Sequence, residues 1–361
     1  MSLYFFVLVT IMGMLNAFEF WDLFGSLAAH GFHLAHAHMG TLGFLTLAIF
    51  AGLSSFSDMS VEKSRSTFRI AGSAIAIFIV FILLRYLLDQ PFLLGLGALI
   101  GFIGVLYGGS LILLEMKRSS SFEFVHAVMI VGTLFFGILF GFLYGLDQMM
   151  NLDIPVEFIS AHPAVLEGGF LVLASVVFAQ AVHGREGIGI QTYFFAGYGI
   201  VIGVGVGFGN DILLNLSLPL FVIGTLVHVI MSAKEIGFQD EKKAHLTFSL
   251  LGIVGYAAFL VYMVVRFLSQ DKAVPDHLFI ASSHLVFLII AANAIFALML
   301  QVYGSPTELF TNSHKIFVYG FNLSAILFVI LLFLDLGALM ASVMGIFLLI
   351  GLGGMLKTLK E

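Results

Sequence analysis

The hydrophobic positions of this chain form long apolar runs, separated by short polar segments at near-regular spacing. Bilayer hydrocarbon holds no water to satisfy the backbone, so runs of about 20 apolar residues cross it as helices. We predict twelve such spans, near residues 3–24, 36–55, 68–88, 92–115, 124–146, 158–182, 188–209, 212–234, 245–267, 277–302, 314–334 and 336–356. The pattern predicts an all-α fold: a polytopic transmembrane helix bundle of about 12 spans, with residues 1–361 forming a single integral membrane domain.

The charged positions indicate how this bundle is oriented. Of the 15 lysines and arginines, all but Arg85, Arg266 and Lys272 fall in alternate connecting segments or at the end of the chain, as Lys63 and Lys117 do. Basic residues are retained on the cytoplasmic side of a membrane. We therefore expect a multi-pass protein of the cell membrane with both termini in the cytoplasm.

The amino-acid composition limits which cofactors and partners the chain could bind. The chain is 60% hydrophobic and holds 12 histidines and no cysteine. The lack of cysteine excludes disulfides, thiolate iron–sulfur clusters and covalently attached c-type haem. The net charge of −6 and the absence of a long basic run make nucleic acid an unsuitable partner. Membrane lipid is the expected surrounding.

The histidines lie almost exclusively near the ends of the apolar spans. Ionisable groups at membrane depth are costly and mark functional sites. The predicted topology sorts most of them into two layers: His36, His38, His162, His277 and His284 near the outer face, and His126, His228, His245 and His314 near the inner face. A single histidine of this kind is more often an amphipathic interfacial residue. Two layers, however, fit a pair of cofactors stacked across the membrane, and we expect one or two b-type haems, with copper or non-haem iron as a further metal.

Helical spacing separates these candidates. His36 and His38 are two residues apart and therefore point about 200° from one another on a helix. His277 and His284 are seven apart, so they share a face two turns apart in depth. The deeper residue of each pair is the better ligand for an iron inside the membrane. The sequence thus favours His38 and His284 as the two axial ligands of an outer haem.

Three charged residues accompany these histidines. Glu167 lies at membrane depth and is a candidate proton carrier with a catalytic role, or alternatively a carboxylate bonded to a neighbouring helix. Arg85 and Arg266 lie near outer helix ends, where guanidinium groups could bind haem propionates as bidentate donors. Arg85 and Asp89 are four apart and could instead pair with each other.

The segment AHAHMGTLGFLTLAIFAG resembles the histidine-then-glycine second helix of the haem-copper oxidase superfamily, which includes nitric oxide reductases and the related NnrS family. His162 followed by Glu167 and Gly168 is similar to the sixth helix of nitric oxide reductase. The resemblance implies that His36 or His38 holds a low-spin haem with His284. It also implies a second metal site near His162, faced by His277 or His284.

Two features depart from that superfamily. The seventh span ends GVGVGFGND and has no histidine pair, and the tenth has His-x6-His where the superfamily has His-x-His. We therefore expect no complete haem-copper binuclear centre. The inner-layer histidines are more similar to those of transmembrane two-haem cytochromes b.

These patterns favour a haem protein that transfers electrons, or handles nitric oxide or oxygen, in a respiratory membrane, as an oxidoreductase or a subunit of one. Quinol or a redox partner protein would supply its electrons. Two alternatives stay open. His30, His33, His36 and His38 could gather a transition metal in a metal-ion or proton-coupled transporter, or the chain could be a non-catalytic membrane anchor of a larger redox complex.

The charge pattern makes a testable prediction of topology. Reporter fusions in the 53–67, 116–123 and 235–244 segments should all report a cytoplasmic position, because each belongs to the alternate segments in which the basic residues gather. A fusion in segment 235–244 that reports the outer side would contradict this orientation and the sorting of histidines into layers.

Overall fold

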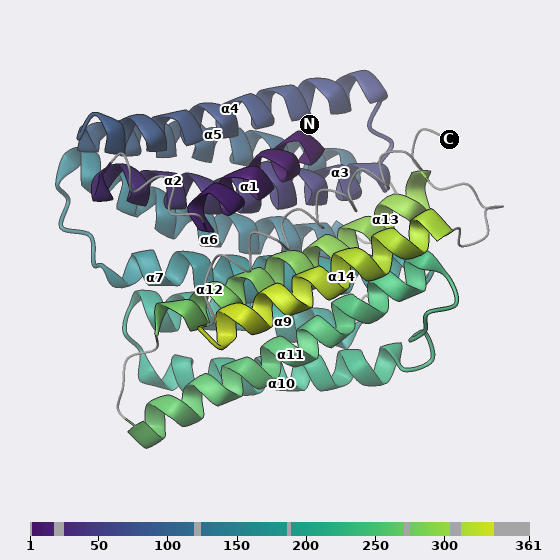
Figure 1. Ribbon diagram of the computed structural model, residues 1–361. Coiled ribbons are helices and arrows are strands. Elements are labelled where there is room, and N and C mark those ends of the chain that lie inside the picture. The colour runs from purple at the N-terminus through teal and green to yellow at the C-terminus, as the bar shows by residue number, and fades with distance from the viewer. Residues whose placement is uncertain are drawn as a thin grey trace.

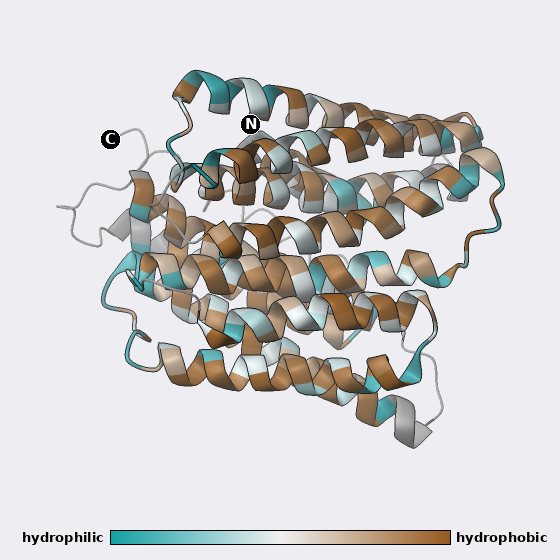
Figure 2. Cartoon of the chain, turned by 180° about the vertical axis from the view of Figure 1, so that it is seen from behind, coloured by the Kyte–Doolittle hydropathy of each residue, from teal (hydrophilic) through white to brown (hydrophobic). Residues whose placement is uncertain are grey.

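The computed structural model describes residues 2–17, 25–118, 124–185, 189–270, 275–303 and 312–335. All regular elements in these ranges are helices, and they run roughly side by side in one bundle (Figure 1). Nine of the described helices are long and apolar enough to cross a membrane, while α1 and α14 contribute shorter apolar stretches, Tyr4–Asn16 and Phe317–Phe333. The predicted span near 336–356 lies outside the described residues. The chain has the helices of a multi-pass membrane protein. Figure 2 shows apolar residues along most of the length of these helices, with hydrophilic residues mainly near the helix ends and connecting segments.

The helices form three units of similar order, the third of which is described as far as α14. The first unit is α1 (Ser2–Ala17), α2 (Ser26–His38), η2 (Met39–Thr46), α3 (Leu47–Ser55), α4 (Val61–Leu87) and α5 (Pro91–Met116). The second is α6 (Phe124–Met150), α7 (Glu157–Ala164), η3 (Val165–Leu171), α8 (Val172–Val182), α9 (Ile190–Gly207) and α10 (Asp211–Ser232). The third is α11 (Glu241–Gln270), α12 (Asp276–His284), η4 (Leu285–Ala291), α13 (Ala292–Tyr303) and α14 (Asn312–Phe333). In each unit the first helix packs against the η segment of the second span.

The η segments are stretches of π-helix within otherwise α-helical spans. A π-helix bonds each residue to the fifth before it and is frequently found at functional sites. One begins directly after His38, one directly after His284, and one three residues after His162. These histidines recur at intervals of 124 and 122 residues. Each unit thus places one histidine at the same point of its second span, and α2, α7 and α12 begin at the same end of the bundle (Figure 1).

The second span begins earlier than the sequence predicted. Helix α2 starts at Ser26 and continues without a break into η2, so His30 and His33 lie inside a helix and not in a loop. His36 and His38 therefore lie about three turns from its start, well inside the bundle. The apolar run alone marks residue 36 as the start because the two earlier histidines interrupt it.

Most described basic side chains lie at the end of the bundle opposite the starts of α2, α7 and α12. Lys63 at the start of α4 bonds Glu115 at the end of α5 at 2.6 Å, and Arg118 bonds the same carboxylate. Lys242 at the start of α11 bonds Gln301 of α13. These contacts agree with the sidedness of the charge pattern.

Two packing features hold the spans together. Asn293 of α13 and Asn322 of α14 exchange amide hydrogen bonds of 2.7 and 3.0 Å, and His245 of α11 bonds Asn293 at 2.6 Å. All three side chains are fully buried. On the other side of the bundle, η3 and α9 approach so closely at Gly169 and Gly199 that a Cβ at Gly169 would lie 2.7 Å from the Gly199 Cα.

This backbone contact gives a prediction of stability. Gly169→Ala should lower the free energy of unfolding by about 1–3 kcal/mol, because backbone must move to admit a methyl group. Gly197→Ala on α9 meets nothing within 4 Å and is the matched control, expected to be neutral or stabilising by up to about 1 kcal/mol. Denaturant unfolding followed by circular dichroism measures both. Equal effects of the two substitutions would contradict the close approach.

Candidate functional site

Two pairs of histidine rings meet on opposite sides of α2. The ring of His36 lies 6.3 Å, centre to centre, from that of His284 on α12. The ring of His38 lies 6.0 Å from that of His162 on α7. The planes within each pair are nearly parallel, at 23° and 17°. One helix thus contributes a ring to each of two junctions between the repeated units.

This pairing differs from the predicted pair of His38 with His284. The prediction chose the deeper histidine of each span, but lateral position decides which rings meet. Residues two apart on a helix point to opposite sides, so His36 and His38 cannot both face α12. In the structure α12 lies on the His36 side and α7 on the His38 side.

Backbone carbonyls fix the orientation of three of the four rings. His38 Nδ1 lies 2.9 Å from the Leu34 carbonyl, and His284 Nδ1 lies 2.8 Å from that of Ile280. His162 Nδ1 lies 2.8 Å from the carbonyl of Gly137 on α6. A carbonyl oxygen can only accept, so each Nδ1 carries the proton and each Nε2 keeps its lone pair. Metal-binding histidines are held in this tautomer by such contacts.

Glycines on the neighbouring helices leave the space that two of these rings occupy; this space is called a seat below. A Cβ at Gly141 of α6 would lie 2.8 Å from both Cε1 and Nδ1 of His162. A Cβ at Gly13 of α1 would lie 2.8 Å from Cε1 of His36. Any other residue at either position would push the ring away from its partner.

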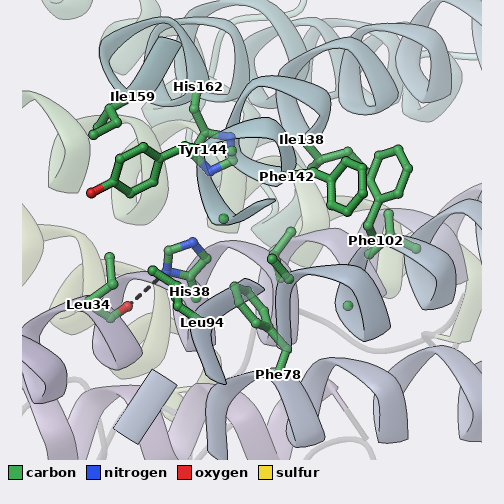
Figure 3. Close-up of a pocket in the computed structure, with 16 residues that line it drawn as sticks. Leu34, His38, Phe78, Leu94, Phe102, Ile138, Phe142, Tyr144, Ile159 and His162 are labelled. Atoms are coloured by element: carbon green, nitrogen blue, oxygen red, sulfur yellow. Dashed lines mark hydrogen bonds between the residues drawn. The ribbon is translucent and has the colours of Figure 1, made fainter. Parts of the chain in front are cut away.

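A cavity surrounds the His38–His162 pair. Its walls come from α2, η2, α4, α5, α6 and α7, and they are almost entirely apolar. Figure 3 shows the two rings projecting from opposite walls toward one another, with Phe78, Phe102 and Phe142 beyond them on one side and Tyr144 on the other. The cavity has a volume of about 130 Å³, and both imidazole rings belong to its lining.

The ring separations fit one metal atom between each pair. A metal–imidazole bond is about 2 Å long and a ring centre lies roughly 1 Å beyond its nitrogen, so two opposed imidazoles on one metal lie about 6 Å apart. Within the described residues no group of three or more His, Cys, Asp or Glu side chains gathers to hold a metal ion. Each junction therefore offers two protein ligands.

Glu167 occupies the remaining junction. It lies in η3, and the Ser283 hydroxyl of α12 donates a 2.6 Å hydrogen bond to its carboxylate. A carboxylate bonded to a neighbouring helix was one of the two sequence expectations, and it is confirmed. The proton-carrier role stays a prediction.

Arg85 lies in the last turn of α4. It pairs with Asp89 at 3.0 Å, as the four-residue spacing allowed, and its guanidinium lies 5.0 Å from the ring centre of Tyr86. Its Nε is buried without a hydrogen-bond partner. Arg266 instead donates to Tyr262 on its own helix, at 3.2 Å.

The other predicted histidines do not join these pairs. His277 lies at the helix start, 4.0 Å from Asp335. His126, His228 and His245 are buried at the opposite end, where His245 belongs to the asparagine network. The side chain of His314 lies outside the described residues. The His245 ring bonds an asparagine and lies beside the rings of Phe296 and Phe317.

The residues that position the rings are not evident from the sequence alone. Gly137 and Gly141 are four apart on α6, a spacing that indicates close helix packing but not which residue fills the space. Tyr198 and Tyr256, which lie near Glu167, appear in the sequence as single tyrosines within apolar spans.

Comparison with protein-family models, curated proteins and solved structures found no match to this chain.

Proposed function

We propose that this protein is a membrane cytochrome of b type that holds two six-coordinate haems, one between His36 and His284 and one between His38 and His162, and transfers electrons between them. The observation that carries the proposal is the two pairs of imidazole rings, whose centres lie 6.3 and 6.0 Å apart, a separation suited to a shared metal atom. The second, sixth and tenth spans that carry them are those that the resemblance to haem-copper oxidases would select.

Haem accounts for these junctions better than a bare metal ion does. Zinc and copper sites built from protein alone generally take three or four ligands. A porphyrin supplies four nitrogens itself and needs two axial ligands. The apolar cavity at His38 and His162 suits a macrocycle, and the aromatic rings of Phe78, Phe102 and Phe142 suit its faces and edges. Arg85 pairs with Asp89 through Nη1, and its Nε, which has no hydrogen-bond partner, could bind a haem carboxylate.

The ligand count also favours electron transfer over gas chemistry. An iron bound by imidazole on both sides has no open position for nitric oxide or oxygen. Each iron would then alternate between oxidation states, and backbone carbonyls would hold the rings of His38, His162 and His284 through their Nδ1 atoms. We further propose that the histidine end faces the outer side of the membrane, that both termini are cytoplasmic, and that quinol or a redox protein exchanges electrons there.

Haem content of single-histidine variants tests the two sites separately. Purified protein should contain two haems per chain with low-spin spectra. His36→Ala or His284→Ala should remove about half of the low-spin absorbance, and His38→Ala or His162→Ala should remove the other half. His245→Ala is the control, because that ring bonds Asn293 and faces no second histidine. Absorbance of the air-oxidised and dithionite-reduced protein, with pyridine haemochrome quantification, measures this.

The outcomes that would contradict the proposal are specific. Purified protein without a Soret band would rule out haem. A variant set in which His38→Ala and His284→Ala remove the same haem would restore the pairing predicted by depth.

The seat at Gly141 gives an independent test on α6. Gly141→Ala should displace the His162 ring and convert the His38–His162 haem to a five-coordinate, high-spin form or release it, leaving the other haem unchanged. Gly132→Ala on the same helix meets nothing within 4 Å and should leave both spectra as in the wild type. An unchanged spectrum in Gly141→Ala would show that this seat does not position the ligand.

A further inference from the structure

Two stacked phenylalanines form one wall of the cavity shown in Figure 3. The rings of Phe102 on α5 and Phe142 on α6, called the aromatic pair below, lie 4.3 Å apart, centre to centre, with planes within 3° of parallel. Ile103, the next residue on α5, and Leu139, almost one turn earlier on α6, lie outside the cavity lining and are exposed. The aromatic pair therefore lies where the cavity comes close to the outer surface of the bundle.

Helices α5 and α6 touch tightly on either side of the aromatic pair. Near the start of α5, a Cβ at Gly145 would lie 2.6 Å from the Cβ of Ala98. Further along, a Cβ at Gly109 would lie 2.8 Å from the ring of Phe135. Residues 98 and 109 of α5 thus bound a window about 16 Å long, or about three helical turns, which the aromatic pair spans. Because the helices are held at both ends of this window, rotation of the two rings is the movement that opens it.

The cavity must widen to take a macrocycle. Its volume is about 130 Å³, whereas pockets that enclose small organic ligands measure about 300–1,000 Å³. The opposite wall is closely packed, since a Cβ at Gly101 would lie 3.1 Å from the side chain of Phe78. Rotation of the aromatic pair toward the exposed side of α5 and α6 adds the space that its rings now fill. The window is therefore the part of the wall that can yield.

We propose that the aromatic pair is a lateral gate through which haem passes between the hydrocarbon of the bilayer and the His38–His162 site. The inference rests on the proposed function and adds the route by which this site is filled. A macrocycle is flat and largely apolar, and the window lies inside two membrane-spanning helices. The rings swing outward to admit it, the Nε2 lone pairs of His38 and His162 each form one bond to its iron, and the rings close again. No proton or electron is exchanged in this step.

Rates of haem uptake and release, measured on the full-length protein in lipid nanodiscs, test the gate. A gate sets rates and not affinity, so Phe102→Ala should speed up both uptake and release at the His38–His162 site. We expect a change of about 2- to 10-fold, the factor that corresponds to one aromatic pair. Uptake is followed by low-spin absorbance after hemin is added to haem-extracted protein, and release by transfer to excess haem-free globin. A His284→Ala background, which lacks the other haem, isolates the signal of this site.

Matched variants separate a gate from a change in binding strength. Phe78→Ala removes a ring that lines the cavity on α4, away from the window, so it should speed up release without speeding up uptake. Ile103→Ala and Leu139→Ala remove exposed side chains beside the aromatic pair and should leave both rates unchanged. Phe142→Leu is a smaller change that serves if Phe102→Ala does not fold, and it should speed up both rates.

The possible results distinguish the gate from the haem site. Unchanged uptake and release in both Phe102→Ala and Phe142→Leu, with haem still bound, would overturn the gate and leave the haem site in place. Faster release without faster uptake in these variants would show that the aromatic pair only stabilises bound haem, and would also overturn the gate. A wild type that takes up no haem would overturn the proposed function instead.

Discussion

Side chains two positions apart on an α-helix point to opposite sides of it. His36 and His38 have this spacing on α2, and the rest of the site depends on it. One ring is directed to α12 and the other to α7, with separations of 6.3 and 6.0 Å. Helix α2 is therefore the shared wall of two junctions. Two irons held there would lie at similar depth on either side of one helix, so electrons would pass laterally and not from one face of the membrane to the other.

Because the membrane interior holds no water, groups of the protein itself must fix the orientation of the rings. Water is not available to satisfy a misplaced imidazole, and an unpaired polar group there is costly. Carbonyls of Leu34, Gly137 and Ile280 each accept from one ring, while glycines on α1 and α6 leave room for the rings to sit. The π-helical segments that follow the histidines change the helical phase at the same depth. Each span can thus present its histidine to one neighbour and its remaining turns to the core.

Much of this fold follows from composition and charge. The spans near 68–88, 92–115 and 124–146 match α4, α5 and α6 because long apolar runs have few other structures open to them. The four paired histidines could be named in advance, since ionisable residues at membrane depth are rare. Their partners could not. Which rings meet depends on the lateral order of the helices and on π-helical segments, and neither leaves a clear signal in hydropathy. His245 shows the same limit: hydropathy places it at membrane depth but does not indicate its bond to Asn293.

Electron paramagnetic resonance of the oxidised protein tests the central claim most directly, because it reports the axial ligands and their relative orientation. Nearly parallel imidazole planes, here 23° and 17° apart, give rhombic low-spin ferric signals. The account predicts two such signals of equal intensity, one lost on replacement of His36 or His284 and the other on replacement of His38 or His162. A single low-spin signal, a high-spin spectrum, or no ferric signal at all would contradict it.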